Sequence, residues 1–119
     1  MSTLDTRTRP DIRKHLPAMR AVLEQQRKFR LEQLRELDEA LTNAVPAREG
    51  DAHDEVKLLL RTAAVAALNE VDDALDRLRA GTYAVCERCS APIPHERLEV
   101  LPMSRYCMRC QRTIESRRS

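Results

Sequence analysis

Residues 81–112 read GTYAVCERCSAPIPHERLEVLPMSRYCMRCQR and hold all four cysteines of the 119-residue chain. They form two C-x-x-C pairs, Cys86 with Cys89 and Cys107 with Cys110, separated by seventeen residues. Two such pairs about 15–20 residues apart are typical of a zinc site. Four thiolates complete the tetrahedral coordination of zinc and leave no position for water. The sequence therefore predicts one structural Zn²⁺ ion rather than a catalytic one.

The same cysteines admit two alternatives, redox-active dithiols or two disulfides. Neither needs the paired arrangement, and disulfides are rare in the reducing cytosol. His95 is a further candidate ligand, but four cysteines already fill a zinc site. The N-terminal residues MSTLDTRTRP lack the apolar stretch of a secretory signal. No apolar run approaches the ~18–20 residues that cross a bilayer, so we expect a cytoplasmic protein without membrane contact.

The residues before this zinc module predict two long helices. Pro17 is suited to the first turn of a helix, which we expect over residues 17–42. Gly81 is suited to the left-handed position that ends a helix, which we expect over residues 51–80. Apolar side chains recur in the second helix at steps of three and four, which gives one continuous face; they are Leu60, Ala64, Leu68, Val71, Leu75 and Leu78. The first helix has a weaker apolar face, formed by Met19, Val22, Leu23, Leu34, Leu37 and Leu41, with Phe29 and Leu31 between them.

Residues 43–50, NAVPAREG, interrupt the periodicity with a proline and a glycine, and we interpret them as a connection. Two helices of similar length with a short connection fold back most simply as an antiparallel hairpin. A small helical bundle completed by dimerisation is the alternative. Aromatic residues are only 3% of the chain and charged residues 34%, a composition that suits long amphipathic helices.

The sequence thus predicts an all-α protein in three parts. Residues 1–16 are expected to form a flexible N-terminal segment, with a short helical turn over 11–16. Residues 17–80 form an antiparallel two-helix coiled-coil hairpin with its tip at 43–55. Residues 81–119 form a four-cysteine zinc-finger module with a short C-terminal helix.

Catalytic motifs are missing from this sequence. Two glycines cannot form a glycine-rich phosphate loop, and the three histidines have no nearby serine or cysteine for a nucleophile–base pair. We therefore predict that the protein is not an enzyme. The net charge of +2 is too small to indicate nucleic-acid binding, although both ends of the chain are basic and the segment between them is acidic.

The zinc module resembles the zinc finger of the DksA/TraR family. The shared residues are Gly81-Thr82-Tyr83 before the first cysteine pair, Ile93, Arg97-Leu98-Glu99 and Pro102 between the pairs, and all four cysteines. Ala84 and Ser90 stand where glycine is usual in the family. The resemblance covers about thirty residues, and the helices before them match the family in architecture more than in identity.

This resemblance implies a transcription regulator. Members of the family insert a coiled-coil hairpin into the secondary channel of bacterial RNA polymerase, where acidic tip residues act near the catalytic centre. RNA polymerase is then the expected partner of a monomer, since the channel admits one hairpin, and sequence-specific DNA binding is not expected. Some members act with the nucleotide ppGpp and others without it, so ppGpp at the polymerase interface is a further candidate ligand. The family's tip pattern, D-x-x-D-x-A, is matched by Asp51, Asp54 and, in place of alanine, Val56.

Both tip aspartates also have a structural interpretation. Asp51 suits the N-cap of the second helix, and Asp54 lies near its positive end. The two roles are compatible, because a capping residue can still face a partner.

The basic residues of the zinc module are interpreted either as polymerase contacts near the channel rim or as a solvated face; they are Arg88, Arg97, Arg105, Arg109 and Arg112. Two other functions also fit the sequence. One is a zinc-ribbon adaptor whose hairpin binds another protein, and the other is a small nucleic-acid-binding zinc protein. The acidic tip argues against the latter, because carboxylates repel phosphate.

Overall fold

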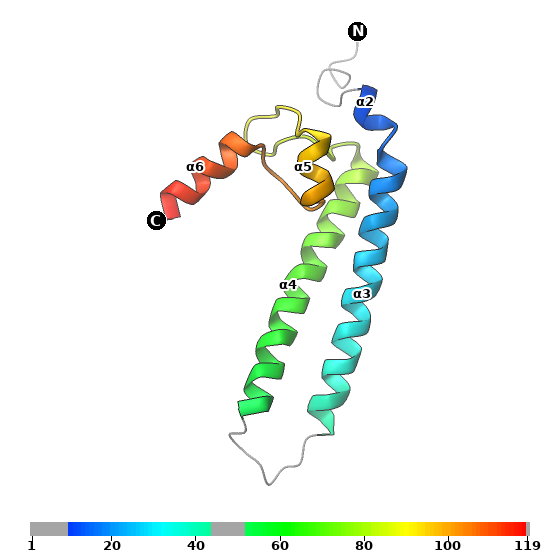
Figure 1. The fold of residues 1–119 in the computed structure, drawn as a ribbon, viewed down its shortest axis with the longest axis vertical. Coiled ribbons are helices and arrows are strands. Elements are labelled where there is room, and N and C mark those ends of the chain that lie inside the picture. The colour runs from blue at the N-terminus through cyan, green and yellow to red at the C-terminus, as the bar shows by residue number, and fades with distance from the viewer. Residues whose placement is uncertain (1–9, 44–51, 119) are drawn as a thin grey trace.

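The structure, a computed structural model, describes residues 10–43 and 52–118. Five helices lie along these residues: α2 (Pro10–Arg13), α3 (Leu16–Thr42), α4 (Ala52–Ala80), α5 (His95–Val100) and α6 (Met108–Arg118). The long helices α3 and α4 pack side by side and antiparallel, and the shorter helices lie at one end of them (Figure 1). The predicted all-α class, with a two-helix hairpin followed by a four-cysteine module, is therefore confirmed.

The observed helix ends agree closely with the local sequence signals. Pro17 occupies the first turn of α3, and Gly81 follows α4 with φ +79°. The N–H groups of Gly81 and Thr82 donate to the carbonyls of Leu78 and Arg77, at 3.3 Å and 2.9 Å. These two bonds are the Schellman arrangement, which satisfies the last carbonyls of a helix and turns the chain sharply. The zinc module therefore begins at the very end of α4.

The apolar seam between α3 and α4 is buried mainly at the zinc end of the hairpin. Val71, Leu75 and Leu78 of α4 are buried, and so are Met19 and Leu23 of α3. Tyr83, Ile93 and Leu98 of the zinc module belong to the same core, together with Cys86 and Cys110. The hairpin and the metal centre thus share one core.

The predicted seam fails toward the tip. Leu60 is 46% exposed, and Leu68 is only half-buried. Residues seven positions apart lie on the same face of a packed helix. The series Leu75, Leu68 and Arg61 therefore places a polar residue in the seam, and Leu60 lies beside the seam. Arg61 instead bonds Asp38 of α3, with Nε 2.6 Å from Oδ1. This half of the hairpin is held partly by an exposed ion pair, which contributes about 0–1 kcal/mol.

The apolar face predicted for α3 is incomplete for the same reason. Leu34, Leu37 and Leu41 are half-buried, whereas Val22, Phe29 and Leu31 are exposed. The residues that share the face of Leu23, at seven-residue spacing, are Arg30 and Leu37. Phe29 lies beside that face. The single phenylalanine of the chain therefore faces outward.

Residues 10–16, for which the sequence predicts a flexible segment with a short helical turn over 11–16, are helical over most of their length. Ile12 of α2 is buried in the shared core, and this burial gives the segment its ordered position. The ring of His15 stacks on that of His95 in α5, with centroids 3.7 Å apart. The N-terminal end of α3 is thus in contact with the zinc module. Residues 1–9 and 44–51, including Asp51 and most of the predicted tip, lie outside the described residues.

Leu23→Ala should destabilise the hairpin by about 2–5 kcal/mol, the usual cost of removing a fully buried leucine side chain. Leu23 is 0% exposed and lies in the shared core. Leu59→Ala is the matched control, because Leu59 is 70% exposed on α4 and its truncation should cost less than about 0.5 kcal/mol. Urea unfolding of both variants, saturated with zinc, measures the difference. Equal midpoints would show that the seam does not stabilise the protein.

Candidate metal centre

The four cysteines converge at one point of the zinc module. Their sulfur atoms all lie within 4.8 Å of one another, and the Sγ atoms of Cys89 and Cys107 are 3.8 Å apart. Four ligands about 2.3 Å from a tetrahedral zinc ion stand about 3.8 Å from each other. All four are free cysteines. The donor set therefore fits one Zn²⁺, which the four residues would hold as thiolates.

Backbone geometry shapes the first cysteine pair into a tight turn. The N–H of Ser90 donates to the carbonyl of Cys86 at 2.9 Å, and the N–H of Cys86 donates to Ala91 at 2.8 Å. An isolated antiparallel bridge joins Val85 to Pro92. These bonds close the loop around the cysteines, so that both sulfurs of the pair point to the same side.

Electrostatics also favours a cation at this point. Burial raises the pKa of the Cys86 thiol, but backbone hydrogen bonds from Cys107, Cys89 and Arg88 outweigh it and lower that pKa to about 6. At Cys110, burial and the three neighbouring thiols raise the pKa to about 11. Four thiolates this close repel one another, and a divalent cation offsets the repulsion.

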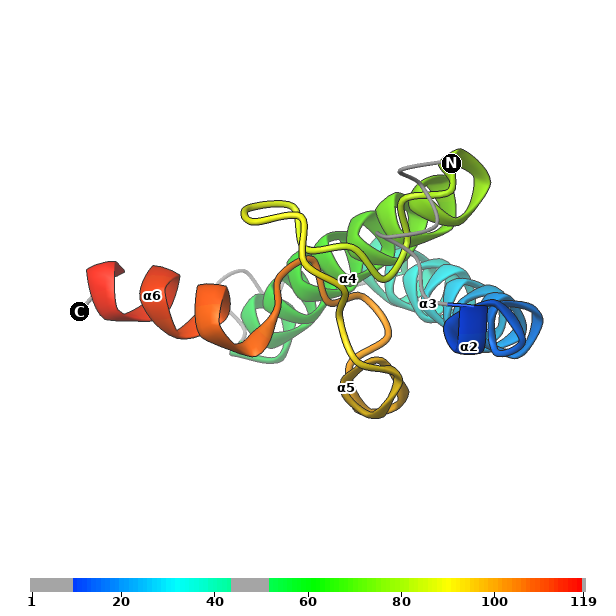
Figure 2. The same ribbon diagram turned by 90° about the horizontal axis from the view of Figure 1, so that it is seen from above.

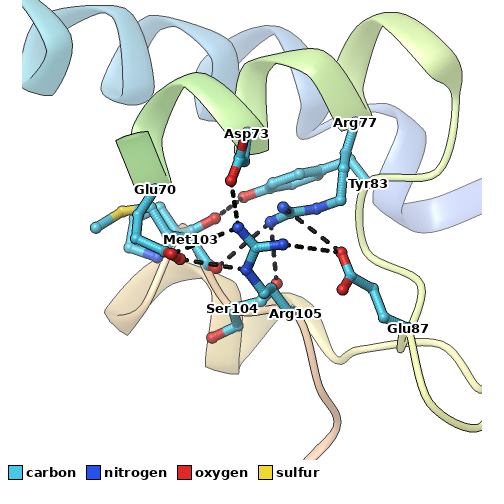
Figure 3. Close-up of polar contacts among 9 residues, drawn as sticks. Glu70, Asp73, Arg77, Tyr83, Glu87, Met103, Ser104 and Arg105 are labelled. Atoms are coloured by element: carbon cyan, nitrogen blue, oxygen red, sulfur yellow. Dashed lines mark hydrogen bonds and ion pairs between the residues drawn. The ribbon is translucent and has the colours of Figure 1, made fainter. Parts of the chain in front are cut away.

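An ion network fastens the metal centre to α4 (Figure 3). Arg105, two residues before Cys107, bonds Glu70 at 3.3 Å and also Asp73, both on α4. It reaches Glu87, the residue after Cys86, at 3.3 Å. The hydrogen bond with Glu70, together with the bond to Asp73, raises the pKa of Arg105. One arginine therefore connects both cysteine pairs to the hairpin.

Two further contacts complete this attachment. The buried hydroxyl of Tyr83 donates to the carbonyl of Pro102 at 2.8 Å, and burial raises its pKa to about 12, so it stays a donor. Arg77 of α4 is half-buried and approaches Glu87 at 3.8 Å. Burial, followed by repulsion from Arg105, lowers the pKa of Arg77. The module is therefore docked on α4 through both polar and apolar contacts.

The arginines singled out from the sequence differ in their surroundings. Arg88 partly opposes the rise in the pKa of the Cys110 thiol, and Arg97 donates to the carbonyl of Tyr106 at 3.2 Å. With Arg105 in the ion network, two of the predicted polymerase contacts, Arg97 and Arg105, also have structural roles. Arg109 and Arg112 are exposed on α6. Sequence reasoning missed Glu70, Asp73 and Glu87, since their pairing with Arg105 depends on the fold.

The described tip residues, Asp54 and Val56, lie at the far end of the hairpin from the cysteines. Asp54 is in the first turn of α4, where its Oδ1 is 3.9 Å from Nζ of Lys57. Val56, at the position where the family has alanine, is 51% exposed. Asp51 lies outside the described residues. His95 stacks on His15 and approaches Glu99 at 3.6 Å, and the metal-binding cluster consists of cysteines alone.

The two departures from the family pattern both adopt left-handed backbone angles, with φ 69° at Ala84 and φ 64° at Ser90. This conformation costs a residue with a Cβ roughly 1–2 kcal/mol, and glycine avoids that cost. Ser90→Gly should therefore stabilise the module by about 0.5–1 kcal/mol, after the greater freedom of glycine in the unfolded chain is counted.

Zinc-saturated urea unfolding measures this gain, with Ser90→Ala as the matched control that keeps the backbone cost. Ala84→Gly should gain less, because the buried Ala84 methyl group is lost from the core. A Ser90→Gly protein no more stable than Ser90→Ala would contradict the prediction.

Comparison with known proteins agrees with this geometry. Residues 81–116 match the family of the prokaryotic dksA/traR C4-type zinc finger. The chain is 43% identical over 56 residues to an uncharacterized protein of Aquifex aeolicus (strain VF5), and 44% identical over 48 residues to general stress protein 16O of Bacillus subtilis (strain 168). These matches cover 47% and 40% of the chain but only 39% and 29% of the relatives.

A solved structure extends the likeness to the hairpin. Transcription factor DksA2 from Pseudomonas aeruginosa matches with a TM-score of 0.79 over 98% of both chains, at 20% sequence identity. The described hairpin and zinc module therefore share the DksA2 fold, whereas the sequence likeness to the other relatives spans less than half of the chain. Zinc is the metal of the C4-type finger that residues 81–116 match, and the four converging sulfurs are placed to bind one such ion. With its C-terminal third matched by sequence and its whole length by fold, the chain carries the zinc finger of the DksA/TraR family on a DksA-type hairpin.

Proposed function

We propose that the protein is a cytoplasmic transcription regulator, without enzymatic activity, that binds bacterial RNA polymerase as a monomer through the secondary channel. In this proposal the hairpin, residues 17–80 with its tip at 43–55, enters the channel, and the zinc module, residues 81–119, stays at the entrance. The observation that carries the proposal is the full-length match to a solved transcription factor, DksA2. The elongated molecule, 67 × 35 × 20 Å, suits insertion into a channel.

The placement of charge supports the same arrangement. Asp54 lies in the first turn of α4, at the end of the hairpin that would reach deepest. Two exposed basic residues, Arg109 and Arg112 of α6, lie at the opposite end. Arg88, Arg97 and Arg105 are candidate polymerase contacts as well, and Arg97 and Arg105 also have contacts within the chain. No described helix has both the length and the apolar character to span a membrane.

Direct binding to purified core RNA polymerase tests the proposal. We expect the chain to co-elute with the core enzyme at one copy per polymerase. The variant with Arg109 and Arg112 both changed to Glu should bind more weakly, whereas Arg20→Glu, an exposed site on α3, serves as the control. A zinc-loaded chain that never associates with the enzyme would favour the adaptor function instead. Transcription assays with and without ppGpp then decide whether that nucleotide contributes.

A further inference from the structure

A groove with a volume of about 610 Å³ runs along one side of the hairpin, and residues of the two long helices alone line it. Its charged lining is balanced, with three acidic and three basic side chains: Glu24, Asp72 and Asp76 beside Arg27, Lys28 and Arg79. In both views α3 forms one outer edge of the molecule, while α6 extends on the other side of α4 (Figure 1, Figure 2). The α3 side of the groove is therefore accessible to another molecule.

Two of the charges in this groove have no partner within the described parts of the chain. Arg27 pairs with Asp72 at 2.7 Å, and Arg79 pairs with Asp76. By contrast, no described side chain of opposite charge pairs with Glu24 or with Lys28. These two residues are exposed and lie one turn apart on α3. One unpaired negative charge and one unpaired positive charge thus stand side by side on the outer side of the hairpin.

Glu24 and Lys28 belong to a longer stripe on α3. Residues at steps of four and three share one face of a helix. The residues with this spacing, which we call the α3 stripe, are all exposed; they are Pro17, Ala21, Glu24, Lys28, Leu31 and Arg35. Leu31, the largest apolar side chain among them, is 41% exposed. This spacing is the one with which a helix packs against another helix.

The α3 stripe is complementary to itself. When two copies of α3 lie antiparallel about a two-fold axis beside Gln26, Glu24 of each copy faces Lys28 of the other. The same axis places Leu31 of each copy opposite Ala21 of the other, so a large side chain meets a small one. A two-fold contact forms every pair twice, because both subunits use the same surface. Opposite charges and unequal volumes are therefore matched along the stripe.

The size and charge of the groove favour a helix with charges of both signs. A helix about 10 Å across rises about 5.4 Å per turn, so the groove takes about one and a half turns. A nucleic acid presents a continuous row of phosphates, which the acidic side chains of the groove would repel. A strongly acidic or strongly basic protein surface would likewise meet like charges. The α3 stripe of a second copy has the mixed charge that the groove requires.

The extent of the contact indicates a weak complex. Over residues 17–35 it would be about 27 Å long and one helix wide. Such a contact lies at the low end of specific interfaces, where complexes are transient. We therefore expect single chains at low concentration and pairs of chains at high concentration.

We propose that the α3 stripe binds α3 of a second copy of this chain in an antiparallel, reversible homodimer. The contact joins Glu24 to Lys28 in both directions and packs Leu31 of each copy against Ala21 of the other. This inference goes beyond the proposed function, because it concerns the protein free of polymerase. A chain that binds polymerase as a monomer leaves the dimer first.

Sedimentation of the zinc-loaded full-length chain over a range of concentrations tests the proposal. The wild type should pass from one chain to two as its concentration rises. Glu24→Lys and Lys28→Glu should each raise the dissociation constant of the dimer at least about tenfold, because each places like charges opposite one another twice. Arg109→Glu is the matched control, since it reverses a charge at an exposed position of α6 that does not line the groove.

Mixing the two single variants separates a lost contact from a damaged fold. In a mixed dimer, both lysines of the Glu24→Lys chain face both glutamates of the Lys28→Glu chain, so an equimolar mixture should associate about as tightly as the wild type. The double variant Glu24→Lys, Lys28→Glu should also recover association, with the signs of its pairs exchanged. Circular dichroism shows that each variant keeps its helices.

Four outcomes would overturn the proposal. The first is a wild type that remains a single chain at every concentration. The second is association that neither single variant weakens, which would place the contact elsewhere on the chain. The third is a mixture that associates no more tightly than either variant alone. The fourth is a monomeric wild type whose polymerase binding is weakened by Lys28→Glu, which would make polymerase the occupant. Sedimentation is done without polymerase, so failure of one proposal leaves the other intact.

Discussion

Removal of the zinc ion should unfold residues 81–112 and lower the helical content of the hairpin as well. Binding energy at a small structural zinc site is folding energy, on the order of 10 kcal/mol or more. Cys86 and Cys110 belong to the same buried core as Leu23 and Leu75 of the hairpin. Loss of the module would therefore uncover the buried end of α3 and α4, where most of the apolar burial lies.

Chelation of zinc from the wild-type protein and the substitution Cys107→Ser both test this prediction. Bound zinc, circular dichroism and protease sensitivity are measured in each case. The wild type should hold one zinc ion per chain, and Cys107→Ser should not hold it tightly. His95→Gln is the control, because His95 lies in a ring stack rather than in the cysteine cluster. A chelated protein that resists protease within residues 81–112 would contradict the structural role of zinc.

The double variant Asp51→Asn, Asp54→Asn should bind polymerase nearly as well as the wild type but lose most of its effect on transcription. Asparagine preserves size and much of the ability to cap a helix while removing two negative charges. Affinity is expected to come from the helices and the basic zinc end, since carboxylates gain little near an already acidic catalytic centre. The inactive variant should therefore compete with the wild type.

Glu55→Gln is the matched control for the tip. Glu55 is exposed in the same turn of α4 as Asp54 but is not part of the D-x-x-D pattern. Its negative charge stabilises the N-terminal end of the helix by about 0.3–1 kcal/mol. In vitro transcription and a polymerase-binding assay are run on both variants. Unchanged regulation by the double Asn variant would show that the two aspartates only cap the helix.

Local signals made much of this fold predictable from the sequence. The cysteine spacing predicted the metal cluster, and Pro17 and Gly81 predicted helix ends that the structure places at α3 and α4. These signals act over a few residues, so they do not depend on tertiary packing. The left-handed angles of Ala84 and Ser90 likewise follow the glycine positions of the family pattern.

Features that depend on the packing of distant segments were not predictable. Leu60 fits the periodicity of the seam, but the choice between Leu60 and Arg61 depends on how α3 faces α4. The contacts of Arg105 join residues up to 35 positions apart, and no periodicity in the sequence indicates them.

The position of the tip in the polymerase complex is the most direct test of the proposed function. Fe²⁺ substituted for the Mg²⁺ ion in the catalytic centre of polymerase produces hydroxyl radicals that cleave nearby polypeptide. We predict cleavage of the bound, end-labelled chain within residues 43–55, and none when Mg²⁺ is kept. A complex that forms normally but leaves this segment uncut, or is cut instead within residues 81–112, would contradict insertion of the hairpin into the channel.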